Sequence, residues 1–291
     1  MNRLLACFFA LLCATLSISS ACFAQSSDWI SFTLQPERSN AGKIHADFRY
    51  EGRGRHDNNW STGFMPSDLI GMEVSSFHAS GTRPLHFAIV REAGRLDCAG
   101  TGGSDFASGN CRFSADPGFT HLLAARGIGQ PTPEQAFGLV AINARSELIN
   151  ALAAARYPTP TIDNLMALSA LRVDGSYIAS MARAGYRPAT LQSLIEFKAL
   201  GITPEWIGGF ARIGYANLAS EELVQMCALG ITPDYISAFE RIGYRNLPVR
   251  KLVELKAMNI TPEFVRSVAG EQKELPPVGK LVDRKIFGSR R

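Results

Sequence analysis

Four tyrosines recur at a fixed spacing of 29 residues along this chain: Tyr157, Tyr186, Tyr215 and Tyr244. Self-similarity of this length is the signature of a repeat architecture, in which each small unit buries its apolar face only against its neighbours. Residues 201–229 and 230–258 are close copies that both open on Gly-Ile-Thr-Pro and carry Ile-Gly-Tyr near the middle. Any fold for this chain must therefore include a stack of repeated units.

The sequence of each unit predicts two short helices. Thr203, Pro204 and Glu205 stand in the order of an N-cap hydroxyl, a first-turn proline and an acidic side chain that complements the helix dipole. Apolar residues then recur at helical spacing, and a glycine ends each helix. We expect the aromatic residues of this stripe to pack in the core rather than to bind a ligand. The predicted units are residues 114–142, 143–171, 172–200, 201–229 and 230–258, followed by a half unit at 259–269.

Residues 27–113 show a different periodicity, in which apolar and polar side chains alternate. Ile30, Phe32 and Leu34, for example, alternate with Ser31 and Thr33. A period of two with one apolar face is typical of half-buried antiparallel strands. We predict a small curved sheet of about five strands whose apolar face packs on the first repeat. The expected fold class is α+β, with a small antiparallel β-sheet domain followed by an α-solenoid-like stack of two-helix repeats.

The two ends of the chain differ from the rest. Residues 1–24 are predicted to be a secretory signal, with Arg3 before a short apolar run and cleavage after Ala24. A lipoprotein anchored through Cys22 is the alternative. We expect export to the periplasm or the cell exterior. Residues 271–291 are predicted to be a basic, flexible tail, and contact with an anionic membrane is expected only through it.

Cysteine usage fits an oxidising compartment. Cys98 and Cys111 both lie on alternating segments, so we predict a cross-strand disulfide between them. Cys227 falls at a repeat position that is polar in the other units. We predict a partly shielded free thiol there, and an intermolecular disulfide is the alternative.

The sequence predicts no catalytic, cofactor-binding or metal-ligating residue. The motifs H-E-x-x-H, S-x-x-K and G-x-S-x-G are all absent. A hydrolase with a site in the loops of the sheet domain, around His56, Asp57 and His78, is kept as an alternative. Nucleic acid is not an expected partner, because the chain has no excess of basic residues outside residues 271–291.

A binding role is the main prediction. Arg183, Arg212 and Arg241 recur at one repeat position and could form a basic ladder, although pairing with neighbouring carboxylates or capping of a helix end is the favoured explanation. We predict an exported, non-catalytic module that binds a protein or peptide partner of the cell envelope; a purely structural spacer is the alternative. The candidate partner-binding residues are Arg183, Arg212, Arg241, Arg245, Arg250 and Lys251.

Several segments together carry a resemblance to a known family. They are PLHFAIVREAGRLDCAGTG, ASGNCRFSADPGF and PTPEQAFGLVAI, followed by the helical units. Residues 29–269 resemble the extracytoplasmic C-terminal region that follows the peptidase domain in some bacterial membrane metallopeptidases of the β-lactam-sensor antirepressor type. Because this chain lacks the H-E-x-x-H of that peptidase and the S-x-x-K serine of the antibiotic sensor, no catalytic residue is carried over. The resemblance implies a sensory or protein-interaction accessory outside the membrane.

Overall fold

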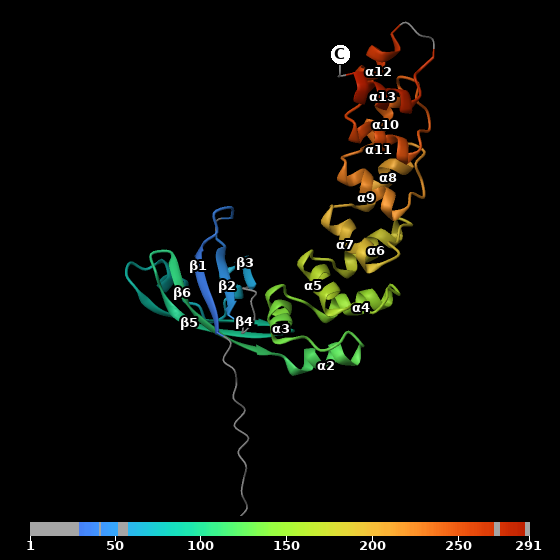
Figure 1. The fold of residues 1–291 in the computed structure, drawn as a ribbon. Helices are drawn as coiled ribbons and strands as arrows, with labels where there is room; N and C mark the ends of the chain where they lie inside the picture. Colours follow the sequence, from blue (N-terminus) through green and yellow to red (C-terminus); the bar gives the residue numbers. More distant parts are fainter. Residues whose placement is uncertain (1–28, 41, 52–57, 271–273, 289–291) are drawn as a thin grey trace, which may run out of the picture.

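The computed structural model describes residues 29–40, 42–51, 58–270 and 274–288. Figure 1 shows a curved sheet at one end and a row of helices that leads away from it toward the C-terminus. The predicted α+β class is confirmed. The predicted signal peptide, residues 1–24, lies outside the described residues. No helix in the described part of the chain is long and apolar enough to cross a membrane.

The sheet domain has six antiparallel strands. They are β1 (Trp29–Pro36), β2 (Ile44–Glu51), β3 (Asn58–Phe64), β4 (Arg83–Arg91), β5 (Gly94–Gly103) and β6 (Phe106–Ala115). The strand order is β3-β2-β1-β6-β5-β4, so two three-stranded meanders are joined where β1 pairs with β6. A 3-10 turn, η1 (Pro66–Asp68), and a short helix, α1 (Val74–His78), connect β3 to β4.

One strand more than predicted is present. Strand β3 reads NNWSTGF, and its alternation is weak because Trp60 and Phe64 are its only large apolar side chains. Its position is set by partners far from its own sequence. Trp60 lies opposite Phe48 of β2, and the two rings stack with their centroids 4.9 Å apart. Cross-strand pairs of this kind stabilise a strand even where its own sequence shows little alternation of apolar and polar residues.

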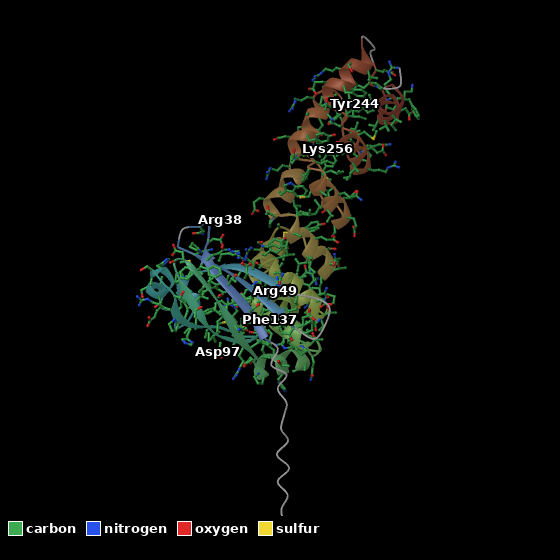
Figure 2. The ribbon with its side chains drawn as sticks, turned by 60° about the vertical axis from the view of Figure 1, so that its left-hand side comes forward. Arg38, Arg49, Asp97, Phe137, Tyr244 and Lys256 are labelled. Carbon is green, nitrogen blue, oxygen red and sulfur yellow. A yellow bond between two sulfur atoms is a disulfide. The ribbon has the colours of Figure 1, made fainter. Side chains whose placement is uncertain are left out.

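The apolar face of the sheet packs on the first repeat, as predicted. Helix α3 (Pro133–Ala141) lies over β5 and β6, and its Phe137 is 2 % exposed. The Phe137 ring lies 5.6 Å from Tyr50 and 6.0 Å from Phe113, measured between ring centroids. Figure 2 shows Phe137 where the sheet meets the stack of helices. One continuous core therefore joins the sheet to the first units.

The helices after the sheet form six pairs within the described residues. They are α2 (Pro117–Ala125) with α3, α4 (Ser146–Ala154) with α5 (Ile162–Ala170), α6 (Gly175–Arg183) with α7 (Leu191–Ala199), α8 (Pro204–Ala211) with α9 (Ser220–Ala228), α10 (Pro233–Glu240) with α11 (Val249–Ala257), and α12 (Pro262–Ala269) with α13 (Val278–Phe287). Thr203, Thr232 and Thr261 cap their helices by accepting a backbone N–H at 3.1–3.3 Å. The Thr-Pro signal thus predicted these helix starts correctly.

The tyrosines that define the period hold successive units together. Tyr186 donates its hydroxyl hydrogen to the carbonyl of Leu218 at 3.1 Å, and Tyr215 does the same to Leu247 at 2.8 Å. Tyr244 donates to the carbonyl of Pro276. Each acceptor lies 32 residues further on, in the loop that precedes the second helix of the next unit. The 29-residue spacing therefore reflects a hydrogen bond that each of these three units makes to its neighbour.

We expect replacement of Tyr215 with phenylalanine to lower the free energy of unfolding by about 1 kcal/mol, because the Leu247 carbonyl would lose its donor. Tyr235 supplies a matched control. Its hydroxyl is buried and has no hydrogen-bond partner among the described residues, so Tyr235→Phe should leave stability unchanged or slightly raised. Urea unfolding of the two variants measures the difference. Equal losses in both would show that the inter-unit hydrogen bond contributes nothing.

The C-terminal end differs from the prediction of a half unit and a flexible tail. Residues 278–287 form helix α13, which packs against α11 and buries Val278 and Leu281. Lys285 lies over the ring of Phe264 at 4.9 Å, as Lys256 lies over Tyr235 at 4.7 Å one unit earlier. The sixth unit is therefore complete. The prediction was wrong here because the basic composition of the segment obscured a short apolar stripe.

The predicted disulfide is present. Cys98 on β5 and Cys111 on β6 lie directly opposite one another and are bonded, with their Cα atoms 4.0 Å apart. Cys227 is a half-buried free thiol in this chain, as predicted. Burial raises the pKa of its thiol, and Sγ lies 3.5 Å from the carbonyl oxygen of Leu200. Whether Cys227 bonds to another chain stays a prediction.

Candidate functional site

The three recurring arginines lie along one edge of the stack. Arg183 ends α6, and Arg212 and Arg241 are the C-cap residues of α8 and α10. All three side chains are exposed, and no ion pair holds any of them within the described part of the chain. The structure therefore does not show carboxylate pairing, whereas the position of all three at helix C-termini, where the helix dipole favours a cation, fits the alternative of helix-end capping. We call Arg183, Arg212 and Arg241 the arginine row.

The other predicted basic residues extend this edge. Arg245 lies in the loop after α10, and Arg250 and Lys251 lie in the first turn of α11. Lys251 is held by Glu254 at 2.6 Å, whereas Arg250 is exposed. The corresponding positions of α9 are Glu221 and Glu222. Cations at the positive end of a helix are unfavourable, so the basic character of this turn is not explained by helix stability.

Of the alternative hydrolase site, His56 and Asp57 lie outside the described residues. His78 Nδ1 lies 2.5 Å from Asp105 Oδ1, and the two side chains are 54 % and 56 % exposed. Water therefore surrounds this pair. In the described residues, no three His, Cys, Asp or Glu side chains gather where they could hold a metal ion. The alternative stays a prediction.

A second feature, which the sequence did not predict, lies where the sheet joins the stack. Arg91, the last residue of β4, directs Nη1 to the carbonyl oxygens of Val140 and Ala141 at 2.5 and 2.6 Å. These carbonyls end α3, where the helix dipole favours a cation. The same guanidinium lies 5.3 Å above the ring of Trp60. Burial lowers the pKa of Arg91 to about 10, and the nearby Asp68 carboxylate opposes that shift.

Glu92, the residue after Arg91, makes a corresponding contact to helix α4. Glu92 accepts the backbone N–H of Ser146, the first residue of α4, at 2.7 Å. Arg145 occupies the N-cap position of α4 and makes no capping hydrogen bond, whereas Asp174 and Thr203 cap the corresponding helices α6 and α8. Glu92 thus supplies an acceptor from the sheet that the repeat itself lacks. Arg91 and Glu92 together fix the sheet to α3 and α4.

A cleft of about 620 Å³ opens beside this junction. One wall is strand β3, of which five consecutive residues, Trp60 to Phe64, line the cleft. The other wall is formed by the turns between α3 and α4 and between α5 and α6. The volume falls within the usual range for ligand-binding clefts. The same strand that the alternation failed to predict therefore forms one side of this cleft.

The charged groups of the cleft are not equally available. Asp174 accepts hydrogen bonds from Ser176 and from the backbone of Tyr177, which lower the pKa of its carboxyl group. Asp68 accepts the backbone N–H of Met65. By contrast, Arg145 and Arg172 are exposed and have no ion-pair partner within the described residues. The lining thus includes three arginines and three carboxylates, and among these Arg145, Arg172 and Glu147 make no ion pair or side-chain hydrogen bond within the described residues.

One hydroxyl that lines the cleft lacks a partner. Ser169 Oγ, near the end of α5, is shut off from solvent and makes no hydrogen bond within the described residues. Buried polar atoms are almost always hydrogen-bonded, so an exception needs an explanation. The repeat position of Ser169 carries lysine at 198 and 256, where the ammonium lies over an aromatic ring. A serine is too short to make that contact.

Comparisons with protein families, with curated proteins and with solved structures found no match to this chain. The resemblance to the extracytoplasmic region of antirepressor metallopeptidases therefore stays a prediction.

Proposed function

We propose that this chain is an exported, non-catalytic recognition module that binds an acidic segment of a partner protein along the arginine row. The single observation that carries the proposal is the recurrence of Arg183, Arg212 and Arg241 at equivalent, exposed positions without ion-pair partners in the described chain. Some other basic residues of the described chain are paired with carboxylates, as Lys251 is with Glu254. A guanidinium presents a planar fork of donors that matches carboxylates.

The geometry of the stack suits an extended partner. Neighbouring helices pack about 8–10 Å apart, so three successive units carry the row over about 20 Å. About six residues of an extended segment cover that distance. Repeat stacks commonly use such long surfaces to bind other proteins. The Cys98–Cys111 disulfide supports the exported part of the proposal, because such bonds persist in oxidising compartments.

The proposal is tested with fluorescein-labelled dodecaglutamate as the probe and fluorescence anisotropy as the readout. Replacing all three arginines of the row with glutamine should weaken binding about tenfold, since each exposed arginine–carboxylate contact contributes roughly 0.5 kcal/mol. Added salt should weaken binding to the native chain further. The matched control replaces Arg38, Arg83 and Arg112, three exposed arginines of the sheet domain, with glutamine.

The control variant should bind dodecaglutamate as tightly as the native chain, and dodecalysine should not bind either protein. Equal weakening in both arginine variants would mean that net charge alone attracts the probe, and this would contradict the proposal. Undiminished binding by the variant of the row would contradict it as well.

A further inference from the structure

The two edge strands of the sheet, β4 and β3, differ in whether other backbone covers their outer edges. At the β4 edge, Ile70 exchanges backbone hydrogen bonds of 2.8 Å with Ala88, so the connection after η1 covers part of that edge. Strand β3 pairs only with β2, and no described backbone group bonds to its outer edge. An uncovered edge presents a row of unpaired N–H and C=O groups that another strand can bind.

Strand β3 also lacks the features by which proteins protect such edges. Charged side chains, proline and bulges commonly block pairing at an edge. The five residues that line the cleft, Trp60 to Phe64, read Trp-Ser-Thr-Gly-Phe and include no charge and no proline. A five-residue strand is about 16 Å long, so β3 offers a full peptide-length edge to the cleft.

We propose that the cleft binds an extended, carboxylate-bearing peptide segment of a partner protein, which adds to the sheet as a strand alongside β3. The backbone of the peptide would pair with the outer edge of β3, a mode of recognition in which main-chain hydrogen bonds supply affinity and side-chain contacts supply specificity. Arg145 and Arg172 on the opposite wall bind its carboxylates.

The distribution of charged side chains in the cleft favours a peptide that bears carboxylates. Arg145 and Arg172 have no ion-pair partner in the described chain, and the carboxylates of Asp68 and Asp174 are engaged by backbone N–H groups. In the described chain, Glu147 is the one carboxylate of the cleft that no hydrogen bond engages, against the two guanidinium groups of Arg145 and Arg172. An acidic peptide meets unpaired donors on one wall and an open strand edge on the other.

This site is separate from the arginine row. The cleft is lined by residues at the start of α4 and α6, whereas the row lies at the ends of α6, α8 and α10. A nine-residue helix is about 13 Å long, so the two features lie on opposite edges of the stack. The inference therefore does not rest on the proposed function, and each is tested with its own variant.

The probe is an acetylated and amidated peptide of four valine–glutamate pairs, and the readout is titration by nuclear magnetic resonance with backbone assignments. The amide resonances of Ser61 to Phe64 should shift on binding. A peptide of the same sequence with N-methylated valines keeps the charge but cannot pair with a strand edge, and it should bind at least about tenfold more weakly. The valine–lysine analogue should not bind.

The double variant Arg145→Gln with Arg172→Gln should weaken binding of the valine–glutamate peptide about fivefold in total, since both arginines are exposed. Neither side chain makes a hydrogen bond in the described structure, so the variant should fold normally. The variant of the arginine row should bind this peptide as the native chain does. Equal affinity for the N-methylated peptide, undiminished binding by the double variant, or shifts confined to residues outside the cleft would each overturn the proposal.

Discussion

Replacement of Phe137 with alanine is expected to lower the free energy of unfolding by about 3–5 kcal/mol, the usual range for deleting a buried aromatic ring. Phe137 is 2 % exposed and packs against Tyr50, Trp60 and Phe113, from three different strands. Its helix, α3, belongs to the first repeat. The deletion would therefore leave a cavity at the contact that joins the sheet to the stack. Urea unfolding followed by circular dichroism measures the loss.

Phe106 provides the matched control, because it is the same residue type but 51 % exposed at the start of β6. Phe106→Ala should change stability by no more than about 0.5 kcal/mol. A loss below about 1 kcal/mol for Phe137→Ala would show that the sheet and the first repeat do not share a core.

Removal of the disulfide is expected to cost about 3 kcal/mol, since the bond closes a short loop between residues separated by 13 positions. The variant Cys98→Ala with Cys111→Ala should unfold at correspondingly lower urea concentrations. A reducing agent should lower the stability of the native chain by a similar amount and leave the double variant unaffected. Both results follow from a bond that restricts the unfolded chain.

Cys227→Ser separates this effect from the chemistry of the free thiol. That variant should retain the native stability under oxidising conditions and lose the same amount as the native chain on reduction. A native chain that is equally stable with and without reductant would contradict a stabilising role for the disulfide.

The periodic part of the fold was largely predictable from sequence. The repeats depend on interactions within one unit or between adjacent units. Their signals, which are the Thr-Pro pairs, the helical stripes and the tyrosine spacing, can therefore be read from short stretches of sequence. Helix α13 was missed because its basic residues suggested a solvated tail, although Val278 and Leu281 repeat the apolar positions of Val249 and Leu252. Alignment of Lys285 with Lys256 would have revealed the sixth unit.

Strand β3 and the cleft were not predictable in the same way. The cleft depends on bringing Trp60, Arg91 and Arg172 together, and these residues come from an edge strand, the opposite edge strand and a turn between helices. The spacing of these three residues in the sequence does not predict that they lie close together, because their proximity results from the curvature of the sheet. The segment PLHFAIVREAGRLDCAGTG, which contributes to the family resemblance, includes Arg91 and Glu92, and the structure shows that these two residues hold the sheet and the helices together.

Photo-crosslinking in the native cell envelope tests the central claim, that the repeats recognise a protein partner, most directly. A photoreactive residue replaces Ala211, which is exposed beside Arg212, or Ala99, which is exposed on the sheet. We predict a discrete crosslinked partner from position 211, none from position 99, and loss of the product when Arg183, Arg212 and Arg241 are all changed to glutamine. No product from position 211, or a product that persists in the triple variant, would contradict the account.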